Sequence, residues 1–326
     1  MSFSAICKAS IDLAALAARL KRRPFKTRSK SEFFRKLSSD ALVRIGKTAE
    51  SSSRSPVVFP ASSFSPQKSY NPPFAVRILL LSDIHSNLEA LDACLAAAPA
   101  YDLVVNLGDT VGYGGNPNEV IAKAQSLGHV FVRGNHDRAV CGLMKLDDFN
   151  PIAGLATLWT RDQLTPENLA WLRSLPQGPV HIDKLPDIQF VHGSSLDEDE
   201  YTVSASDAIE PLITSPAPIT FFGHTHLQGG FVLSGAVSEA YRPGYRTVGQ
   251  PESSDWPLRK NRRYLVNPGS VGQPRDGDWR AAFAVFDSDS WIVTFHRVPY
   301  NLRIAQEKII AANLPQRLAT RLAAGR

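Results

Sequence analysis

The chain of 326 residues has few cysteines and no long hydrophobic run. Its three cysteines, Cys7, Cys94 and Cys141, are too few for a disulfide framework in a chain of this length and indicate a reducing compartment. No apolar run reaches the roughly 18 residues of a membrane-spanning helix. Hydrophobic residues make up 43% and charged residues 21%, which excludes a fully disordered or collagen-like chain. We therefore expect a globular, cytoplasmic protein without a membrane partner.

Acidic residues are scarce in the first 75 residues, which carry 14 Lys and Arg but only 4 Asp and Glu. The remainder carries 22 basic and 27 acidic residues, so the net charge of +5 hides a mildly acidic body. A protein that binds nucleic acid usually carries its basic stripe on the folded domain. We therefore expect no nucleic-acid partner.

Residues 1–75 form a basic segment rich in Ser and Pro, which buries too little apolar surface to fold and is predicted to be a disordered extension. Two short helical patterns, Ile11–Leu20 and Glu32–Leu42, lie within it. Three interpretations stay open: a disordered tail, a transit peptide that would make the location organellar, or a segment that is not normally translated.

From Val76 to the end, short apolar runs alternate with helical stretches, and this alternation predicts one α/β domain over residues 76–326. A pair of helices within Pro151–Leu175 predicts a helical insert at about 143–176. Ser206 is expected to cap a helix to Ile213, the stretch Ser234–Lys260 to be a surface loop, and the end from Ile304 to be helical. The predicted strands are Val76–Leu81, Leu103–Asn106, Val130–Val132, Asp187–Val191, Ile219–Phe222, Tyr264–Asn267, Ala282–Phe286 and Ile292–Val298.

Polar side chains follow the ends of five of these strands. In open α/β sheets, ligands bind in the crevice at the carboxyl ends of strands, so five separate segments deliver His, Asp and Asn to one rim. The residues are Asp83, His85, Asp109, Asn135, His136, Asp137, His192, His224 and His226. The three histidines outside these motifs, His129, His181 and His296, are expected to be ordinary surface or core residues.

With His136 and Asp137 left aside, the ligand types in this set are two Asp, one Asn and four His. A mixed nitrogen and oxygen set suits Mn, Fe, Co, Ni or Zn, and the lack of cysteine argues against a structural zinc site. Seven ligands are too many for one tetrahedral ion and suit two ions that share a carboxylate. Such a pair can clamp the attacking and leaving oxygens of a phosphoryl displacement.

These motifs resemble the calcineurin-like metallophosphoesterase superfamily, over about Val76 to Pro299. The matching strings are Asp83-Ile84-His85, Gly108-Asp109, Gly134-Asn135-His136-Asp137, His192-Gly193 and Gly223-His224-Thr225-His226. The fuller strings Gly108–Gly114 and Asn267–Asp278 look like a prokaryotic subgroup of small cytosolic phosphoesterases. The resemblance implies a four-layer αββα sandwich of two mixed sheets flanked by helices.

The resemblance also assigns roles. One ion would be held by Asp83, His85, Asp109 and His226, and the other by Asp109, Asn135, His192 and His224. Manganese is the first choice for both ions. A metal-bridged hydroxide would attack phosphorus, with His136 as general acid. Asp137 would either orient His136 or act as a carboxylate at a helix N-terminus.

One departure concerns substrate. Protein phosphatases of the superfamily carry an Asp-Arg pair three and four residues after the bridging Asp, where this chain has Gly112 and Tyr113. Arg133 or Arg275 could supply the missing positive charge or could form surface ion pairs, and Tyr113 could line a substrate pocket. The leading hypothesis is a phosphatase of small phosphorylated substrates. Alternatives are a phosphodiesterase acting on cyclic nucleotides or other diesters, a metal or nucleotide sensor, and a nuclease.

Overall fold

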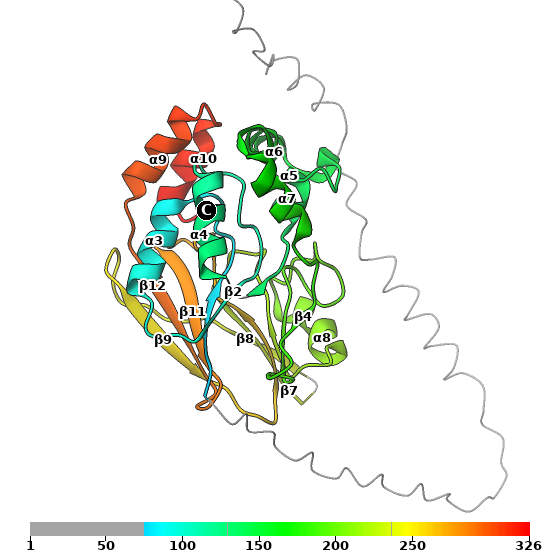
Figure 1. Cartoon of the computed structure of the whole chain (residues 1–326). Helices are drawn as coiled ribbons and strands as arrows, with labels where there is room; N and C mark the ends of the chain where they lie inside the picture. The colour runs from blue at the N-terminus through cyan, green and yellow to red at the C-terminus, as the bar shows by residue number, and fades with distance from the viewer. Residues whose placement is uncertain (1–74, 129, 236) are drawn as a thin grey trace, which may run out of the picture. The chain divides into compact units, whose positions relative to one another are not determined.

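Two mixed β-sheets of six strands each lie at the centre of the computed structural model, which describes residues 75–128, 130–235 and 237–326 (Figure 1). The predicted disorder and helical patterns of the basic extension lie outside the described residues. None of the described helices is long and apolar enough to cross a membrane.

The first sheet has the order β3-β2-β1-β11-β12-β9. Strands β1, β2 and β3 are parallel, and β11, β12 and β9 continue the sheet in antiparallel pairs. The strands are β1 (Arg77–Leu81), β2 (Leu103–Asn106), β3 (Val130–Phe131), β9 (Glu252–Pro257), β11 (Ala281–Asp287) and β12 (Ile292–Val298).

The second sheet has the order β4-β5-β6-β10-β7-β8. Strands β5, β6 and β10 are parallel, while β4, β7 and β8 pair in antiparallel fashion at the two sides. The strands are β4 (Val180–His181), β5 (Ile188–Phe190), β6 (Ile219–Phe221), β7 (Gly229–Ser234), β8 (Val237–Tyr241) and β10 (Arg263–Asn267).

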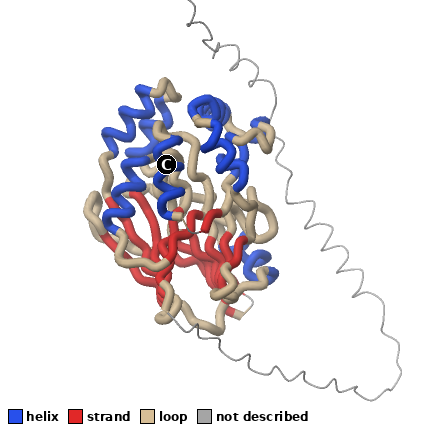
Figure 2. Tube along the Cα trace, viewed as in Figure 1, coloured by secondary structure: helices blue, strands red, loops and turns tan. Residues whose placement is uncertain are grey.

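Helices cover the outer faces of both sheets, which gives the expected four layers (Figure 2). Leu91 of α3 and Ile309 of α9 pack on the first sheet, and Leu212 of α8 packs on the second. The helices are α3 (Leu88–Ala97), α4 (Pro117–Leu127), α5 (Asn135–Val140), α6 (Pro151–Gln163), α7 (Pro166–Ser174), α8 (Ala205–Thr214), α9 (Leu302–Ala311) and α10 (Gln316–Ala323), with a 3₁₀ turn, η1 (Leu146–Asp148).

Strand β1 shows how the sequence builds these layers. Successive side chains of a strand point to opposite faces, so Ile78 and Leu80 enter the core between the sheets while Leu79 and Leu81 face the helices. All four are buried, and each contributes about 1.5–3 kcal/mol of stability. A strand that is apolar on both faces therefore lies in the middle of the sandwich, and its end brings Asp83 to the centre of the rim.

Apolar contacts and the hydrogen bonds of one arginine, Arg161, anchor the helical insert beside the first sheet. Leu164 and Leu172 pack against Val111 and Val140. The guanidinium of Arg161 donates hydrogen bonds to the backbone carbonyls of Ala139 and Val140 at the end of α5, at 2.6 and 2.7 Å. Cations favour helix C-termini, so this contact fixes the insert to α5, which carries Asn135 and His136.

Two local predictions are wrong. The stretch Ser234–Lys260 is not one surface loop, because it contains β8 and β9. The exposed polar residues of β9 lie at a sheet edge, where no apolar alternation marks a strand. The helix α8 is capped by Ser204 rather than Ser206: the Ser204 hydroxyl accepts from the amide of Asp207, whose carboxylate accepts from the amide of Ser204.

Candidate metal centre

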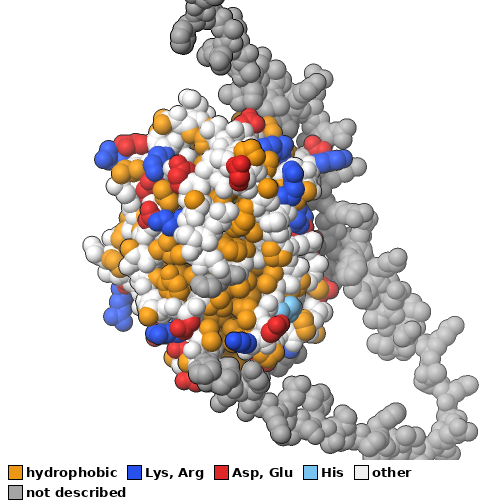
Figure 3. Space-filling view, viewed as in Figure 1, with side chains coloured by type: hydrophobic (Ala, Val, Ile, Leu, Met, Phe, Trp, Pro, Cys, Tyr) orange, Lys and Arg blue, Asp and Glu red, His pale blue; other side chains and the backbone are white. Residues whose placement is uncertain are grey.

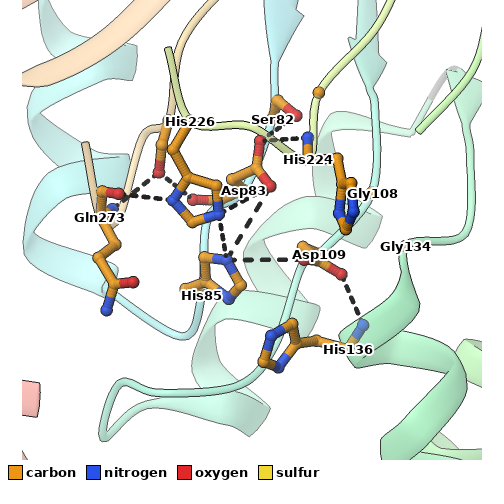
Figure 4. A network of polar contacts seen from close by, with 12 residues as sticks. Ser82, Asp83, His85, Gly108, Asp109, Gly134, His136, His224, His226 and Gln273 are labelled. Carbon is orange, nitrogen blue, oxygen red and sulfur yellow. Dashed lines mark hydrogen bonds and ion pairs between the residues drawn. The ribbon is translucent and has the colours of Figure 1, made fainter. Parts of the chain in front are cut away.

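The strand-end side chains of both sheets converge on one buried rim (Figure 4). Asp83 and His85 follow β1, and Asp109 follows β2. Asn135 opens α5 after β3, His192 follows β5, and the pair His224 and His226 follows β6. The structure thus brings together all seven residues that the sequence predicts as ligands.

The ligand atoms form two groups that share one carboxylate. The first group is Asp83, His85, Asp109 and His226, and the second is Asp109, His192 and His224, with the ligand atoms of each group within 4.8 Å of one another. Asn135 joins the second group, because its Oδ1 lies 3.2 Å from His192 Nε2. The Oδ2 of Asp109 lies 3.6 Å from His85 Nε2 and 3.5 Å from His192 Nε2, between the two groups.

Main-chain carbonyls fix the orientation of three imidazoles. The Nδ1 atoms of His85, His192 and His226 lie 3.1, 2.8 and 2.6 Å from the carbonyl oxygens of Val111, Leu107 and Gln273. A ring that donates from Nδ1 presents its Nε2 lone pair to the centre, as metal-binding histidines do. The two Nε2 atoms of His85 and His226 then face each other at 3.1 Å, an arrangement that a cation between them would stabilise.

The two carboxylates are held ionised in spite of complete burial. Burial raises the pKa of Asp83, but the nearby His226 outweighs it and the pKa falls well below its usual value. Burial also raises the pKa of Asp109, but His192 and His136 outweigh that effect, and the net pKa lies well below its usual value. Burial lowers the pKa of His85, His224 and His226, so these rings are neutral at pH 7. At His192 burial also lowers the pKa, but Asp109 outweighs it and raises the pKa to about 9, so this ring must lose a proton to bind a metal. Ionised carboxylates and neutral imidazoles are the forms that bind divalent metals.

Backbone strain is concentrated at this rim. Seven of the nine described non-glycine residues with positive φ lie in the strand-end loops, with φ between 48° and 65°. A non-glycine residue in this region costs about 1–2 kcal/mol. They are Asp83, His85, Ser86, Asp109, Tyr113, His224 and His226. The neighbouring loops hold one another in this conformation, for instance through the amide of His85, which donates to the carbonyl of Asp109 at 3.0 Å.

His136 lies beside the ligands without joining either group. Its backbone amide donates to Asp109 Oδ1 at 2.8 Å, and its ring lies between Tyr113 and Phe149, with centroids 4.4 and 4.9 Å away. Burial lowers the pKa of His136 to about 4, although Asp109 raises it in part. The Nδ1 atom of the ring is buried and has no hydrogen-bond partner among the described residues.

Asp137 supports the loops and does not orient the His136 ring. Its Oδ2 accepts from the amide of Gly134 and its Oδ1 from the amide of Val111, both at 3.1 Å. The carboxylate therefore caps α5 and ties it to the loop that follows Asp109. Of the two predicted roles, the geometry gives the helix N-terminal one. Burial raises the pKa of Asp137 to about 7.

The three predicted substrate-binding residues differ in their surroundings. Tyr113 is buried and contacts His85, with ring centroids 4.6 Å apart. Arg133 pairs with Glu198 at 3.3 Å, so its charge is already partnered. Arg275 lies beside Tyr113 and Tyr201, has no carboxylate within 4.0 Å among the described residues, and buries an Nε without a partner.

A cavity of about 330 Å³ opens beside the two ligand groups. Its lining includes the rim residues His136, Asn135 and His224 and the aromatic residues Tyr113, Phe149 and Tyr201. Tyr201 covers His224 with ring centroids 3.9 Å apart. Sequence reasoning missed Phe149, Tyr201 and Asp199, because they lie in loops without a motif.

Residues 76–290 match the family model described as the calcineurin-like phosphoesterase superfamily domain. The chain belongs to this superfamily. An uncharacterised protein of Methanocaldococcus jannaschii is 36% identical over 251 residues, which are 76% of this chain and 98% of that protein. The crystal structure of a metallophosphoesterase from Sphaerobacter thermophilus is 39% identical, with a TM-score of 0.65, and covers 78% of this chain and 100% of that one.

A hypothetical protein from Pyrococcus horikoshii has the same fold, with a TM-score of 0.60 at 20% identity over 77% of this chain and 99% of that one. The predicted superfamily and its two-sheet fold are therefore confirmed. Membership of the calcineurin-like superfamily indicates hydrolysis of phosphoric esters, and the Asp and His groups of the rim could hold divalent metal.

Proposed function

We propose that the chain is a phosphatase that uses two divalent ions, manganese first among them, to hydrolyse small phosphorylated substrates. The observation that carries the proposal is the pair of buried ligand groups that share Asp109. One ion would be held by Asp83, His85, Asp109 and His226, and the other by Asp109, Asn135, His192 and His224. When bound, two such ions supply positive charge for the phosphoryl oxygens and lower the pKa of water.

His136 is the residue that would transfer a proton to the leaving oxygen. With a pKa of about 4 the free ring is neutral at pH 7. A phosphate dianion in the adjoining cavity would raise that pKa, because an opposite charge nearby favours the protonated ring. No described carboxylate is hydrogen-bonded to Nδ1, so protonation of the ring would depend on the charge of the substrate rather than on Asp137.

The surroundings of the rim favour a small anionic substrate. The cavity of about 330 Å³ accommodates a small molecule. Arg275, which has no carboxylate within 4.0 Å among the described residues, lies beside Tyr113 and Tyr201, which bound the cavity. On the face shown in Figure 3, basic and acidic side chains are interspersed and form no basic field. This distribution supports the proposal that nucleic acid is not a partner.

The test compares wild type with His136→Ala in Mn²⁺. Wild type is expected to hydrolyse p-nitrophenyl phosphate faster than bis-p-nitrophenyl phosphate, and faster cleavage of the diester would point to a phosphodiesterase instead. His136→Ala should retain both ions but lose about 10²–10⁴-fold in turnover of phenyl phosphate, whose phenolate is a poor leaving group. The loss should be smaller with p-nitrophenyl phosphate, whose leaving group needs less help from a proton. Equal losses on both esters would remove the proton-transfer role.

A further inference from the structure

A second cavity adjoins the one beside the rim, and its wall carries three arginines. It has a volume of about 630 Å³ and is lined by Asn150, Pro151, Ile152, Arg317, Arg321 and Arg326. We call it the arginine cleft. Asn150, the residue before α6, also lines the cavity beside His136, so the two spaces are neighbours there. In Figure 1, α10 and α6 stand on the two sides of this region.

The arginines are placed by the spacing of α10. Leu318, Ala319 and Leu322 turn one face of the helix into the core. Arg317 and Arg321, four residues apart, share another face, where like charges at this spacing destabilise a helix. Among the described residues, no acidic side chain lies within 4.0 Å of either guanidinium and none lines the cleft. This local excess of positive charge stands out in a body whose acidic residues outnumber the basic ones.

Arg321 connects the cleft with the rim. Its guanidinium lies 5.3 Å from the ring centroid of Tyr113, and that ring contacts the ligand His85. The Nε of Arg321 donates to the main-chain oxygen of Arg326 at 2.7 Å, which holds together two of the residues that line the cleft. Burial lowers the pKa of Arg321, and the neighbouring charges of Arg275 and Arg317 lower it further. These three cations repel one another, and among the described residues no acidic side chain lies within 4.0 Å of them.

We propose that the arginine cleft binds a second phosphate group, so that the substrate is an ester carrying more than one phosphate. One phosphate would lie at the two ligand groups and the next would extend past Tyr113 to Arg321 and Arg317. Arginine suits this role because its planar fork hydrogen-bonds phosphate oxygens in pairs. This inference rests on the proposed function, since it places the first phosphate at the rim.

The experiment measures binding, so that it does not depend on turnover. Inorganic tripolyphosphate and orthophosphate are titrated calorimetrically into the full chain at one fixed free Mn²⁺ concentration. Tripolyphosphate is expected to bind at least tenfold more tightly than orthophosphate. Arg317→Gln and the double variant Arg317→Gln/Arg321→Gln should reduce that ratio by about fivefold or more. Arg303→Gln on α9, which removes the same charge from an exposed pair with Glu307, should leave the ratio unchanged.

Metal chelation by tripolyphosphate is the same for every variant and cancels from the comparison. A nucleoside triphosphate titrated in parallel identifies the source of the phosphate groups. If Arg317→Gln weakens the binding of both the nucleoside triphosphate and tripolyphosphate, the cleft is assigned to phosphate esters. If it weakens the binding of tripolyphosphate alone, the cleft is assigned to inorganic chains, and the ester is not the ligand. Equal affinities for tripolyphosphate and orthophosphate, or a ratio that Arg317→Gln leaves unchanged, would overturn the inference. Absence of p-nitrophenyl phosphate turnover in wild type would instead contradict the proposed function.

Discussion

Gly134 lies directly against Asp109 in the candidate metal centre, and this contact makes a sharp prediction for Gly134→Ala. A Cβ added at Gly134 would lie 2.1 Å from Asp109 Oδ1 and 2.2 Å from Asp109 N. The backbone of Gly134 is extended, with φ −91° and ψ 171°, so alanine adopts it without strain. The cost of Gly134→Ala is therefore the collision with Asp109, both with its backbone nitrogen and with the carboxylate that both ligand groups share.

Relief of this collision requires Asp109, its backbone included, to move by about 1 Å relative to Gly134, and a misplacement of that size in an active site can cost about 10²-fold in rate. Overpacking of a tight core site costs about 1–3 kcal/mol. For a protein of this size, each kcal/mol lowers the melting temperature by about 2–4 °C. We therefore expect Gly134→Ala to remain folded, to melt a few degrees lower, and to lose at least about 10²-fold in p-nitrophenyl phosphate turnover together with bound metal.

The matched control is Gly154→Ala in α6. No atom lies within 4 Å of a Cβ added at Gly154, and alanine in a helix interior is favoured over glycine by about 1 kcal/mol. Gly154→Ala should therefore keep its turnover and melt at the same or a higher temperature. If Gly134→Ala held two ions and turned over substrate like wild type, the proposed position of Asp109 between the two ions would be refuted.

Two further predictions concern stability. Asp137→Ala leaves the buried amides of Gly134 and Val111 without an acceptor, and should lower the free energy of unfolding measured in urea by about 2–4 kcal/mol. The control Asp102→Ala, at an exposed position, should lower it by less than about 1 kcal/mol. Equal losses in the two variants would contradict the capping role of Asp137. Burial lowers the pKa of His296 from 6.5 to about 4, so the stability it contributes is present above pH 6.5 and is lost as the pH falls towards 4. Between pH 7.5 and pH 5, the free energy of unfolding in urea should fall by about 1 kcal/mol more in wild type than in His296→Gln. The variant His181→Gln, at an exposed position, should behave as wild type does. Identical losses in wild type and His296→Gln would contradict this expectation.

The strand-end motifs could be predicted because their chemistry is carried by side chains. Asp83, His85, Asp109, His192 and the two histidines after β6 follow short buried strands, and parallel strands bring such ends to one edge. The superfamily and the two-sheet fold followed from the same motifs. Asn87 and Thr165 belong to the residue types that favour helix starts, and their side chains accept from the amides of Ala90 and Asn168 at the beginning of α3 and α7.

The parts that escaped prediction depend on main-chain groups or on distant loops. The carbonyls of Val111, Leu107 and Gln273 orient the histidines, but a carbonyl has no signature in sequence. The same holds for the two amides bound by Asp137. Phe149 and Tyr201 reach the rim from loops whose course depends on the packing of the insert. The strand β9 was missed because its polar residues lie at a sheet edge, where pairing with β12 rather than burial fixes it.

The central claim is that Asp109 holds two ions at once, and Asp109→Asn tests it most directly. Metal analysis of the purified full chain after dialysis against Mn²⁺ should find two ions in wild type and in the exposed control Asp92→Asn. Asp109→Asn removes the charge that both ligand groups share and should lose both ions together with p-nitrophenyl phosphate turnover. Two ions and full turnover in Asp109→Asn would contradict the shared-carboxylate centre.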